Sequence, residues 1–500
     1  MRKDILISVE PQETRVAVVE GARLEEFYVE RAQIERLVGN VYKGKVQSIT
    51  TGIGAAFIEI GMPKNGFLYV SDIVGISSEL EENVELVVTK RPRHQPNRIE
   101  DIVKKDQEIM VQVTKEPFGN KGPRLTTKIS LPGRYIVLMP KDDHIGISKR
   151  IEDPKERQRL RQVLEGLPVP KGMGVIVRTA AEKRSKRDFV RDLRFLVKLW
   201  RRIEANFNRN SAPSLLHQEH GLIFRILRDL FTEDIDRLIV DSKPEYKEIF
   251  RYVMQLMPHL RKRIELYREI EPLFEKRRIE EQIEKIYKRK VELKSGGYII
   301  IEQTESLVAI DVNSGRYIGK KDIEETVFNV NMEAAKEVAR QIKLRDLGGI
   351  IVIDFIDMKS GEHRKKVFKA LEEELKLDKA KTNILQISEL GLVQMTRQRS
   401  RKTVESVAYQ VCPYCQGKGA TKSVQTMAIG AIRKMKIFFS SNRSAKRIEL
   451  AVNPDVASRL FNEDRNSITY LERHYRAGIN IKPDTSLHIE QVKIQEVGKR

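Results

Sequence analysis

The chain contains 500 residues, of which 40% are hydrophobic and 33% are charged. At roughly 100 to 200 residues per domain, this length predicts about three to five domains with separate cores, and the apolar content excludes a disordered or fibrous chain. Lys and Arg number 92 against 71 Asp and Glu, a formal net charge of +21, so a polyanionic partner is expected.

The cysteine content and the N-terminus indicate where the protein works. The only two cysteines, Cys412 and Cys415, cannot form a disulfide framework, which is typical of a reducing compartment. Charges occur early in the chain, and no stretch approaches ~18 uninterrupted apolar residues. We therefore expect a cytoplasmic protein without a signal peptide or a membrane span.

Short strands separated by glycine are predicted for the N-terminal part of the chain. A hairpin is expected between Ile5 and Val19, and five strands should follow near residues 40–49, 52–60, 66–70, 108–114 and 124–129. Five short strands with glycine at the corners suit a small barrel of the oligonucleotide-binding (OB) type. The charged, turn-rich segment Ser77–Arg98 is expected to be a mobile excursion outside the core.

The middle of the chain is predicted to contain more helix. A strand at Gly174–Arg178 precedes a charged helix from Arg187 to Asn206, and a linker follows at residues 208–213. Helical periodicity then predominates from about Leu215 to Leu293. Strongly basic helical turns in this region are by default solvated faces.

A strand, helix, strand unit is predicted from Leu307 to Asp354. An apolar strand at Gly297–Glu302 precedes it, and a helix follows it. The unit itself consists of a strand at 307–311, a long helix from Asp322 to about Arg345, and a strand at 350–354, and the helix after it runs from about 362 to 376. The two strands of such a unit normally run parallel, with a right-handed crossover.

Two carboxylates, Asp311 and Asp354, end the two parallel strands. They should converge at one sheet edge, where open α/β sheets usually bind ligands, and the amide of Asn313 points to the same side if the strand stays extended. Two nearby carboxylates without a basic partner favour Mg²⁺ or Mn²⁺, and a metal that also binds phosphate oxygens suits phosphodiester hydrolysis. Ordinary turn chemistry at strand ends is the alternative.

The segments around these residues resemble the ribonuclease E/G family. The resemblance is carried by residues 291–305, 310–315, 348–358 and 391–399, and residues 39–45, 119–122 and 172–180 extend it over essentially the whole chain. It implies a magnesium-dependent endoribonuclease that cuts single-stranded RNA, including ribosomal RNA precursors and mRNA. It also implies that Asp311 and Asp354 bind magnesium and that Asn313 contacts the scissile phosphate.

The resemblance further implies a multidomain α/β fold in which an OB-type barrel is inserted in a ribonuclease H-like subdomain. The implied parts are residues 1–38 and 216–280 (ribonuclease H-like subdomain), 39–127 (RNA-binding barrel), 128–215 (5′-phosphate sensor region), 281–403 (deoxyribonuclease I-like catalytic domain), 404–420 (zinc link) and 421–500 (small C-terminal α/β oligomerisation domain). The absence of a long Pro- or Arg-rich extension resembles the ribonuclease G branch of the family, although the Asp311–Gly315 segment is closer to the ribonuclease E branch.

Barrel aromatics and one strand end are the candidate RNA contacts. Exposed aromatic rings on barrel strands can stack bases while basic groups follow the phosphates, although Phe57 by itself is more typical of a core position. The resemblance implies that Phe57, Phe67 and Lys115 contact RNA. It also implies that Arg178 and Thr179, a guanidinium fork beside a hydroxyl, bind the 5′-monophosphate of the RNA.

The segment Cys412-Pro-Tyr-Cys415 is compatible with a redox motif or with a metal site. The glycine-rich residues 416–419 open no helix, which favours metal. Structural Zn²⁺ needs four ligands, so the other two must be histidines, for which His217 and His220 are the only close pair, or the cysteines of a second copy. The resemblance implies the second arrangement, a shared zinc that links a dimer or a dimer of dimers (a homotetramer).

Three functions from different classes therefore remain open. The first is a metal-dependent endoribonuclease, and the second is a non-catalytic RNA-binding scaffold that uses the same barrel and charge. The third is a thiol oxidoreductase built around Cys412 and Cys415, which does not explain the net charge of +21. The joint presence of Asp311, Asn313 and Asp354 favours the endoribonuclease.

Overall fold

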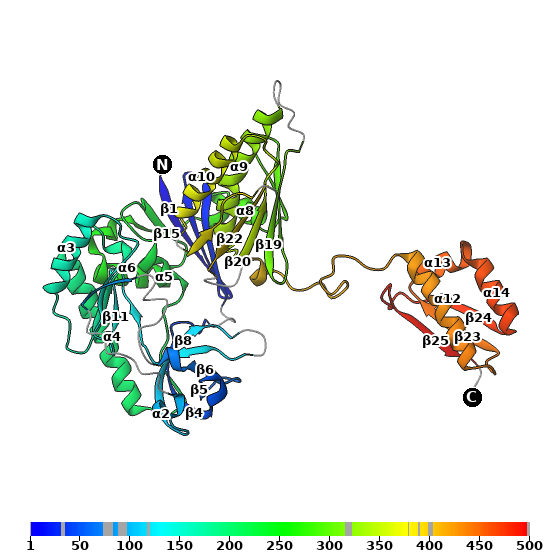
Figure 1. Ribbon diagram of the computed structural model, residues 1–500, viewed down its shortest axis with the longest axis horizontal. Coiled ribbons are helices and arrows are strands. Elements are labelled where there is room, and N and C mark those ends of the chain that lie inside the picture. The colour runs from blue at the N-terminus through cyan, green and yellow to red at the C-terminus, as the bar shows by residue number, and fades with distance from the viewer. Residues whose placement is uncertain are drawn as a thin grey trace. The chain divides into compact units, whose positions relative to one another are not determined.

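The computed structural model describes residues 2–31, 36–73, 84–88, 98–117, 121–315, 323–378, 380–388, 391–398 and 404–497. The chain divides into two compact units, residues 1–404 and 405–500, both of which mix helices and strands (Figure 1). Within the described ranges, no helix is both long and apolar enough to cross a lipid bilayer.

The first sheet contains strands from two distant parts of the sequence. Its order is β16-β15-β1-β2-β3, in which β1, β2 and β3 are antiparallel and β15 and β16 join parallel to β1. The hairpin predicted between Ile5 and Val19 is therefore confirmed. The strands are β1 (Lys3–Val9), β2 (Glu13–Glu20), β3 (Arg23–Arg31), β15 (Arg237–Val240) and β16 (Ile264–Leu266).

Helices cover both faces of this sheet. α5 (Leu222–Asp229) and α6 (Lys243–Leu256) pack on one face, and α7 (Leu273–Lys276) and α8 (Glu280–Ile286) pack on the other. The prediction that helix predominates from Leu215 to Leu293 is wrong at β15 and β16. Each is a run of three or four residues that becomes a strand because a partner distant in sequence offers backbone hydrogen bonds.

Five strands close the predicted barrel. β4 pairs with both β5 and β8, and β6 and β9 complete the circle. All five predicted barrel strands are confirmed, and β14 (Ser214–His217) adds to the outside of β4. The barrel strands are β4 (Val41–Thr50), β5 (Ala55–Glu59), β6 (Gly66–Tyr69), β8 (Glu108–Lys115) and β9 (Arg124–Thr126), with the short helix α2 (Ile99–Ile102) before β8.

A further sheet, β10-β11-β13-β12-β7, takes four strands from the sequence between the barrel and β14, and its edge strand β7 from the segment between β6 and β8. Most of Ser77–Arg98 falls outside the described residues, but Val84–Val88 forms β7 and pairs with β12. Val84 is 7% exposed and packs with Met139 and Ile176, so the prediction that this segment avoids the core is wrong for β7. The other strands are β10 (Leu131–Pro132), β11 (Ile136–Met139), β12 (Ile145–Ser148) and β13 (Gly174–Val177).

The long helix α4 (Lys186–Arg209) supports this sheet together with α3 (Pro154–Glu165). Ser185 and Asp188 form a capping box at the start of α4, which satisfies two free backbone amides of its first turn. Apolar side chains at helical spacing, Phe189, Leu193, Leu196, Trp200 and Ile203, are buried on one face. The helix predicted at Arg187–Asn206 is confirmed.

The βαβ unit lies in a six-stranded sheet of order β17-β18-β19-β20-β22-β21. β19 and β20 are parallel, as predicted, and α9 connects them. α9 and α10 lie side by side on one face of the sheet (Figure 1). The elements are β17 (Lys290–Glu292), β18 (Tyr298–Gln303), β19 (Leu307–Asn313), α9 (Ile323–Leu344), β20 (Gly349–Asp354), α10 (Gly361–Lys376), β21 (Thr382–Ile384) and β22 (Leu392–Arg397).

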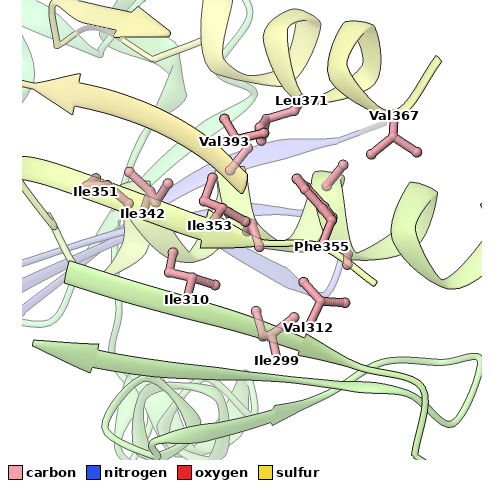
Figure 2. Close-up of a cluster of buried hydrophobic side chains, with 14 of the residues drawn as sticks. Ile299, Ile310, Val312, Ile342, Ile351, Ile353, Phe355, Val367, Leu371 and Val393 are labelled. Carbon is pink, nitrogen blue, oxygen red and sulfur yellow. The ribbon is translucent and has the colours of Figure 1, made fainter. Parts of the chain in front are cut away.

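The buried core of this sheet sets which side chains face outward. Figure 2 shows Ile310, Ile353 and Val393 of the strands next to Val367 and Leu371 of α10. Since successive residues of a strand point to opposite faces, the residues next to these buried positions point to the face that α9 and α10 leave uncovered. Asp322, the predicted first residue of α9, lies outside the described residues.

The second unit is the predicted separate α/β tail. β23 is the central strand, parallel to β24 and antiparallel to β25, and three helices pack with this sheet around one core. Its elements are α12 (Val424–Ser441), β23 (Arg447–Val452), α13 (Pro454–Asn462), α14 (Arg465–Tyr475), β24 (Gly478–Pro483) and β25 (Val492–Glu496), and a short helix, α11 (Val404–Ala408), begins at the boundary of the two units.

Candidate active site

Asp311 and Asp354 are register partners in the parallel pair β19–β20. Their chain neighbours Ile310, Val312 and Ile353 are buried against α9 and α10, so both carboxylates lie on the opposite, exposed face of the sheet. The two side chains are therefore neighbours, as the strand, helix, strand pattern predicts. Within the described part of the chain, no Lys, Arg or His forms an ion pair with either carboxylate.

The surroundings of Asp354 disfavour its ionised form. Partial burial, and then the charges of Asp311 and Asp357, raise the pKa of Asp354 above its ordinary value. Asp357 is exposed and lies in the loop after β20. A divalent cation between the carboxylates would remove this repulsion, and three carboxylates with free oxygens are the ligand type that Mg²⁺ prefers. The sequence analysis did not single out Asp357, although it lies in the quoted segment 348–358.

Asn313 stays next to Asp311 because β19 remains extended as far as this residue. Its side-chain amide donates a hydrogen bond of 2.7 Å to Asp311 Oδ2. An Nδ2 group carries two hydrogens, so a second donor remains for an oxygen of a bound ligand. Asn313 and Asp311 thus form a donor and an acceptor on the same exposed strand edge.

Two glycine positions explain the shape of the turn beside Asn313. Gly315 has a φ of +61°, and a Cβ atom on it would lie 2.4 Å from the carbonyl oxygen of Gly296. A Cβ on Gly297 would lie 2.8 Å from the carbonyl oxygen of Asn313. Only glycine allows this backbone-to-backbone contact, which holds the end of β19 against the turn before β18.

Asn331 of α9 fixes the loop that follows β20. This side chain is 0% exposed; its Nδ2 donates to the carbonyl oxygen of Ile356 at 2.7 Å, and its Oδ1 accepts from the Ile356 amide at 3.1 Å. Ile356 lies between Asp354 and Asp357, so the two hydrogen bonds hold the segment that carries both carboxylates. The sequence offered one signal for this role, a polar residue on the apolar face of a helix.

Four residues of the barrel, one on each of four neighbouring strands, form a line across its surface. Phe57 pairs with Phe67, Phe67 with Arg124, and Arg124 with Lys115. The rings of Phe57 and Phe67 are 4.9 Å apart between centroids, and both are half-buried, whereas their neighbours Ala56 and Leu68 are in the barrel core. The two rings therefore lie on the outer surface of the barrel, beside the exposed Lys115.

Arg124 is a member of this line that the sequence analysis missed. Its guanidinium binds Asp72 through Nε at 2.8 Å and through a terminal nitrogen at 3.1 Å, and it lies 5.3 Å from the ring centroid of Tyr69. By contrast, Lys43 is 8% exposed and donates to the carbonyl oxygens of Phe207 and Asn210. The ammonium group of Lys43 therefore ties the barrel to the end of α4 and does not contribute surface charge.

Arg178 and Thr179 lie at the end of β13, where sequence analysis predicted a phosphate clasp. The Arg178 guanidinium donates to the carbonyl oxygen of Gly133 and to Asp229 Oδ1, both at 2.7 Å. Although burial opposes ionisation, the charges of Arg178 and Arg228 lower the pKa of Asp229 below its ordinary value. Asp229 thus holds Arg178 in place, while Thr179 is exposed beside it.

The cysteine pair lies in a turn before α12. Cys412 is exposed and Cys415 is half-buried. Hydrogen bonds from the backbone amides of Gly419 and Gly417 lower the pKa of the Cys415 thiol, which is the arrangement that suits a metal-binding thiolate. The helix α12 begins later, at Val424, and its N-cap is Ser423, so neither thiol occupies the helix start expected of a redox motif.

His488, which the sequence analysis missed, connects this turn to the rest of the second unit. Its ring lies 4.1 Å from that of Tyr414, between centroids, and its Nε2 is 2.7 Å from the Tyr414 carbonyl oxygen. Nδ1 accepts from the Glu490 amide, so both ring nitrogens are engaged within the chain. His217 and His220, the alternative zinc ligands, belong to the first unit, and burial is the main cause that lowers the pKa of each.

Among the residues that the structure describes, one other cluster has the composition of a cation site. Oxygen and nitrogen atoms of Asp142, Asp143 and His144 lie within 4.8 Å of one another in the turn between β11 and β12. The Asp142 carboxylate already accepts hydrogen bonds from the backbone and the ring of His144. This turn belongs to a different sheet from Asp311 and Asp354 and was not predicted as a site.

Comparison with known proteins gives matches over nearly the whole chain. The model of the Ribonuclease E/G family matches residues 130–400, and that of the "RNase E/G, Thioredoxin-like domain" matches residues 411–497. Ribonuclease G of Salmonella typhimurium is 37% identical over 494 residues, 99% of each chain. Ribonuclease G of Haemophilus influenzae is 39% identical over 465 residues, 93% of each chain. Ribonuclease E of Escherichia coli is 38% identical over 475 residues, 94% of this chain and 44% of that protein.

The Asn331 contact leads to a first prediction. Asn331→Leu removes both hydrogen bonds to Ile356 and should lower the free energy of unfolding by about 1 to 3 kcal/mol. Because the loop with Asp354 and Asp357 then loses its anchor, kcat for RNA cleavage should fall further than the loss of folded protein explains. Denaturant unfolding and single-turnover kinetics measure the two effects.

Gln341→Leu is the matched control, since Gln341 is a buried amide on the same helix that bonds Glu337 and Arg345 instead. It should lose similar stability and keep kcat. Equal effects of the two variants on kcat would show that Asn331 supports only the fold.

Proposed function

The chain belongs to the Ribonuclease E/G family, and from this premise we propose that it is a magnesium-dependent endoribonuclease that cuts single-stranded RNA. The observation that carries the proposal is the pair Asp311 and Asp354, adjacent on the open face of β19 and β20 with negative charge that no described side chain neutralises. The proposed reaction is hydrolysis of a phosphodiester bond. Ribosomal RNA precursors and mRNA are the proposed substrates.

The residues of the site fit a magnesium ion. Asp311 and Asp354 would hold it, and Asp357 offers a further carboxylate from the same loop. When bound, such an ion neutralises phosphate charge and lowers the pKa of a coordinated water. Asn313, with one amide hydrogen on Asp311, would direct the other to an oxygen of the scissile phosphate and so orient the strand for attack.

The barrel line would present the RNA strand to this site. Phe57 and Phe67 offer two adjacent ring faces on which successive bases can stack without sequence preference, and Lys115 and Arg124 continue the line with positive charge for the phosphates. Arg178 and Thr179 would bind a 5′-monophosphate at the strand end, with Asp229 orienting the guanidinium.

The topology supports the division implied by the family. The sheet β16-β15-β1-β2-β3 is interrupted after β3 by the barrel, as expected for a ribonuclease H-like subdomain at residues 1–38 and 216–280 with the barrel at 39–127 inserted. We propose residues 128–215 as the sensor region and 281–403 as a deoxyribonuclease I-like catalytic domain. Residues 404–420 and 421–500 would form the zinc link and an oligomerisation domain.

We further propose that Cys412 and Cys415 bind a zinc ion shared with a second copy of the chain. Two thiols supply half of a tetrahedral Zn²⁺ site, and a two-fold axis supplies the other half. The hydrogen bonds that lower the pKa of Cys415 support a thiolate here. The stacking of His488 on Tyr414 would hold the turn in shape for this contact.

The carboxylate pair gives the second prediction. Asp311→Asn and Asp354→Asn should each abolish Mg²⁺-dependent cleavage of a short single-stranded RNA, whereas RNA binding should persist. Glu302→Gln, which removes an exposed carboxylate from the neighbouring strand β18, should keep the activity. Cleavage by either Asp variant at the wild-type rate would refute the proposed function.

Asp354→Asn and the wild type should also respond differently to metal in unfolding experiments. Because the folded-state pKa of Asp354 is raised, its ionised form opposes folding above that pKa, and stability increases as the pH falls through it. In a chelator at neutral pH, Asp354→Asn should therefore be more stable than the wild type. Added Mg²⁺ should raise the unfolding temperature of the wild type and have little effect on the variant.

The phosphate clasp gives the third prediction. Charge-assisted hydrogen bonds of about 1.5 to 3 kcal/mol imply that a 5′-monophosphorylated RNA is cut roughly tenfold or more efficiently than its 5′-hydroxyl form. Arg178→Ala should abolish this preference while the 5′-hydroxyl substrate is cut almost as before. The measurement is kcat/KM for both RNA ends at one salt concentration.

Arg184→Ala is the control for this experiment, because Arg184 belongs to the same region but pairs with Glu233. It should retain the preference for the 5′-monophosphate. If Arg178→Ala slows both substrates equally, Arg178 is a general or structural residue and the sensor assignment fails.

The cysteine pair gives the fourth prediction. Cys412→Ser and Cys415→Ser should release zinc and shift the protein to smaller species in sedimentation, whereas His217→Asn should leave the zinc content unchanged. His488→Phe keeps a ring against Tyr414 but loses the hydrogen bond to its carbonyl oxygen, so it should weaken zinc retention against a chelator. Zinc that stays bound in the double cysteine variant would refute the shared site.

A further inference from the structure

The surface of α4 is unusually basic. The helix contains eight Lys and Arg residues against three Asp and Glu. Arg187, Arg191, Arg194, Lys198 and Arg202 recur every three or four residues, so they lie along one face. At a rise of about 1.5 Å per residue this stripe is roughly 20 Å long.

Four of the five cations of this stripe have no ion-pair partner among the described residues, and the fifth, Arg191, lies 3.6 Å from a carboxylate oxygen of Asp188. In the described ranges, Arg187, Arg194, Lys198 and Arg202 of the stripe, and Arg201 next to it, are exposed and form no ion pair or hydrogen bond. Of the three acids of α4, Asp188 is in the capping box and pairs only with Arg191 of the stripe, Asp192 is buried and accepts backbone hydrogen bonds, and Glu204 is exposed beyond Arg202. Like charges three or four positions apart destabilise a helix, so the stripe opposes folding unless a polyanion neutralises it.

The helix α10 shows the contrasting, ordinary arrangement. Its exposed Lys369 and Lys376 are each paired with a glutamate four positions away, Glu373 and Glu372. This is the alternating pattern of a solvated helix surface. The stripe on α4 does not follow it.

Part of the stripe borders a groove. Lys186, Arg187, Arg194 and Lys198 line one side of a hollow of about 780 Å³, and Gln255 and Leu256 of α6 line the other. Arg191 reaches across it to the carbonyl oxygen of Leu256 at 3.5 Å. The groove is therefore open to solvent and has positive charge along one edge.

We propose that the α4 stripe and this groove bind the phosphate backbone of the RNA substrate, as an anchor separate from the barrel and from Asp311 and Asp354. The proposal rests on the proposed function for the identity of the polyanion. A row of exposed cations recognises the charge of the phosphates and not the bases. The anchor would therefore favour long RNA over short RNA without adding sequence preference.

An anionic membrane surface is a less suitable occupant. Helices that bind membranes insert an apolar face into the lipid. The apolar residues of α4, Phe189, Leu193, Leu196, Trp200 and Ile203, are buried in the protein core. Val190 and Phe195, which line the groove, are half-buried, and the exposed residues of α4 are all polar and mostly Lys or Arg, which matches a phosphodiester chain.

The experiment compares RNAs of two lengths on full-length protein made inactive by Asp354→Asn. The short RNA has about 10 nucleotides, within the site size of one OB-type barrel, and the other is several times longer. Binding is measured by fluorescence anisotropy between about 50 and 200 mM salt. The test variant adds Arg194→Gln and Lys198→Gln, and the matched control adds Lys369→Gln and Lys376→Gln on α10.

The test variant should bind the longer RNA on the order of tenfold more weakly near 100 mM salt, and its salt slope should fall by about 1.4, or 0.7 for each lost phosphate contact. The ratio of affinities for long over short RNA should fall with it, while the control keeps the wild-type ratio. The unfolding temperature of the test variant should not decrease, because two like charges that repel each other are removed.

An unchanged affinity ratio and salt slope in the test variant would overturn the proposal. Reduced binding to anionic lipid vesicles with an unchanged RNA ratio would also overturn it, in favour of a membrane surface. A second assay separates failure of this proposal from failure of the proposed function. It measures cleavage of the short RNA in Mg²⁺ by the protein with Asp354 intact. If that cleavage is absent, the proposed function fails, and if it is present with an unchanged ratio, only the role of α4 fails.

Discussion

The parallel register of β19 and β20 is the constraint on which the candidate site depends. It places Asp311 directly beside Asp354, against their mutual repulsion. The pairing is held from the other face by the apolar core under α9 and α10 (Figure 2), and Asn331 holds the loop after β20 from within that core. Burial on one face therefore supplies the stability that the polar face gives up, as is usual where function requires strained or repelling groups.

Charge is distributed unevenly over this basic chain. Asp311 and Asp354 have no ion-pair partner among the described residues, whereas the barrel line ends in Arg124 and Lys115 and α4 carries a stripe of mostly unpaired cations. A net charge of +21 draws a polyanion to the surface from a distance and raises its rate of association. In the proposed function, the local negative charge is the place for a divalent cation, so the strand would be attracted by one surface and cut at another.

Local patterns predicted the elements whose partners are close in sequence. The barrel strands, the helix α4 and the βαβ unit were all recognisable, because each has a strong period of apolar residues or glycine at its ends. β15, β16 and β7 were missed or misassigned. Each is a short run that becomes a strand only through hydrogen bonds to distant residues, such as those between β15 and β1, and no local signal reports such a partner.

The sequence by itself determined the chemistry available to this protein: two acids at the ends of parallel strands, two aromatic residues on barrel strands, an arginine and threonine at a strand end, and one cysteine pair. Strand alternation and the right-handed crossover were enough to bring Asp311 and Asp354 to one edge. Only the tertiary structure decided that Arg124 completes the line from Phe57 to Lys115 and that Lys43 links the barrel to the end of α4. It also decided that Asp229 holds Arg178 and that His488 supports the cysteine turn. These contacts join residues far apart in the chain, and since folding selects them through packing and hydrogen bonding of whole elements, no local pattern of residues encodes them.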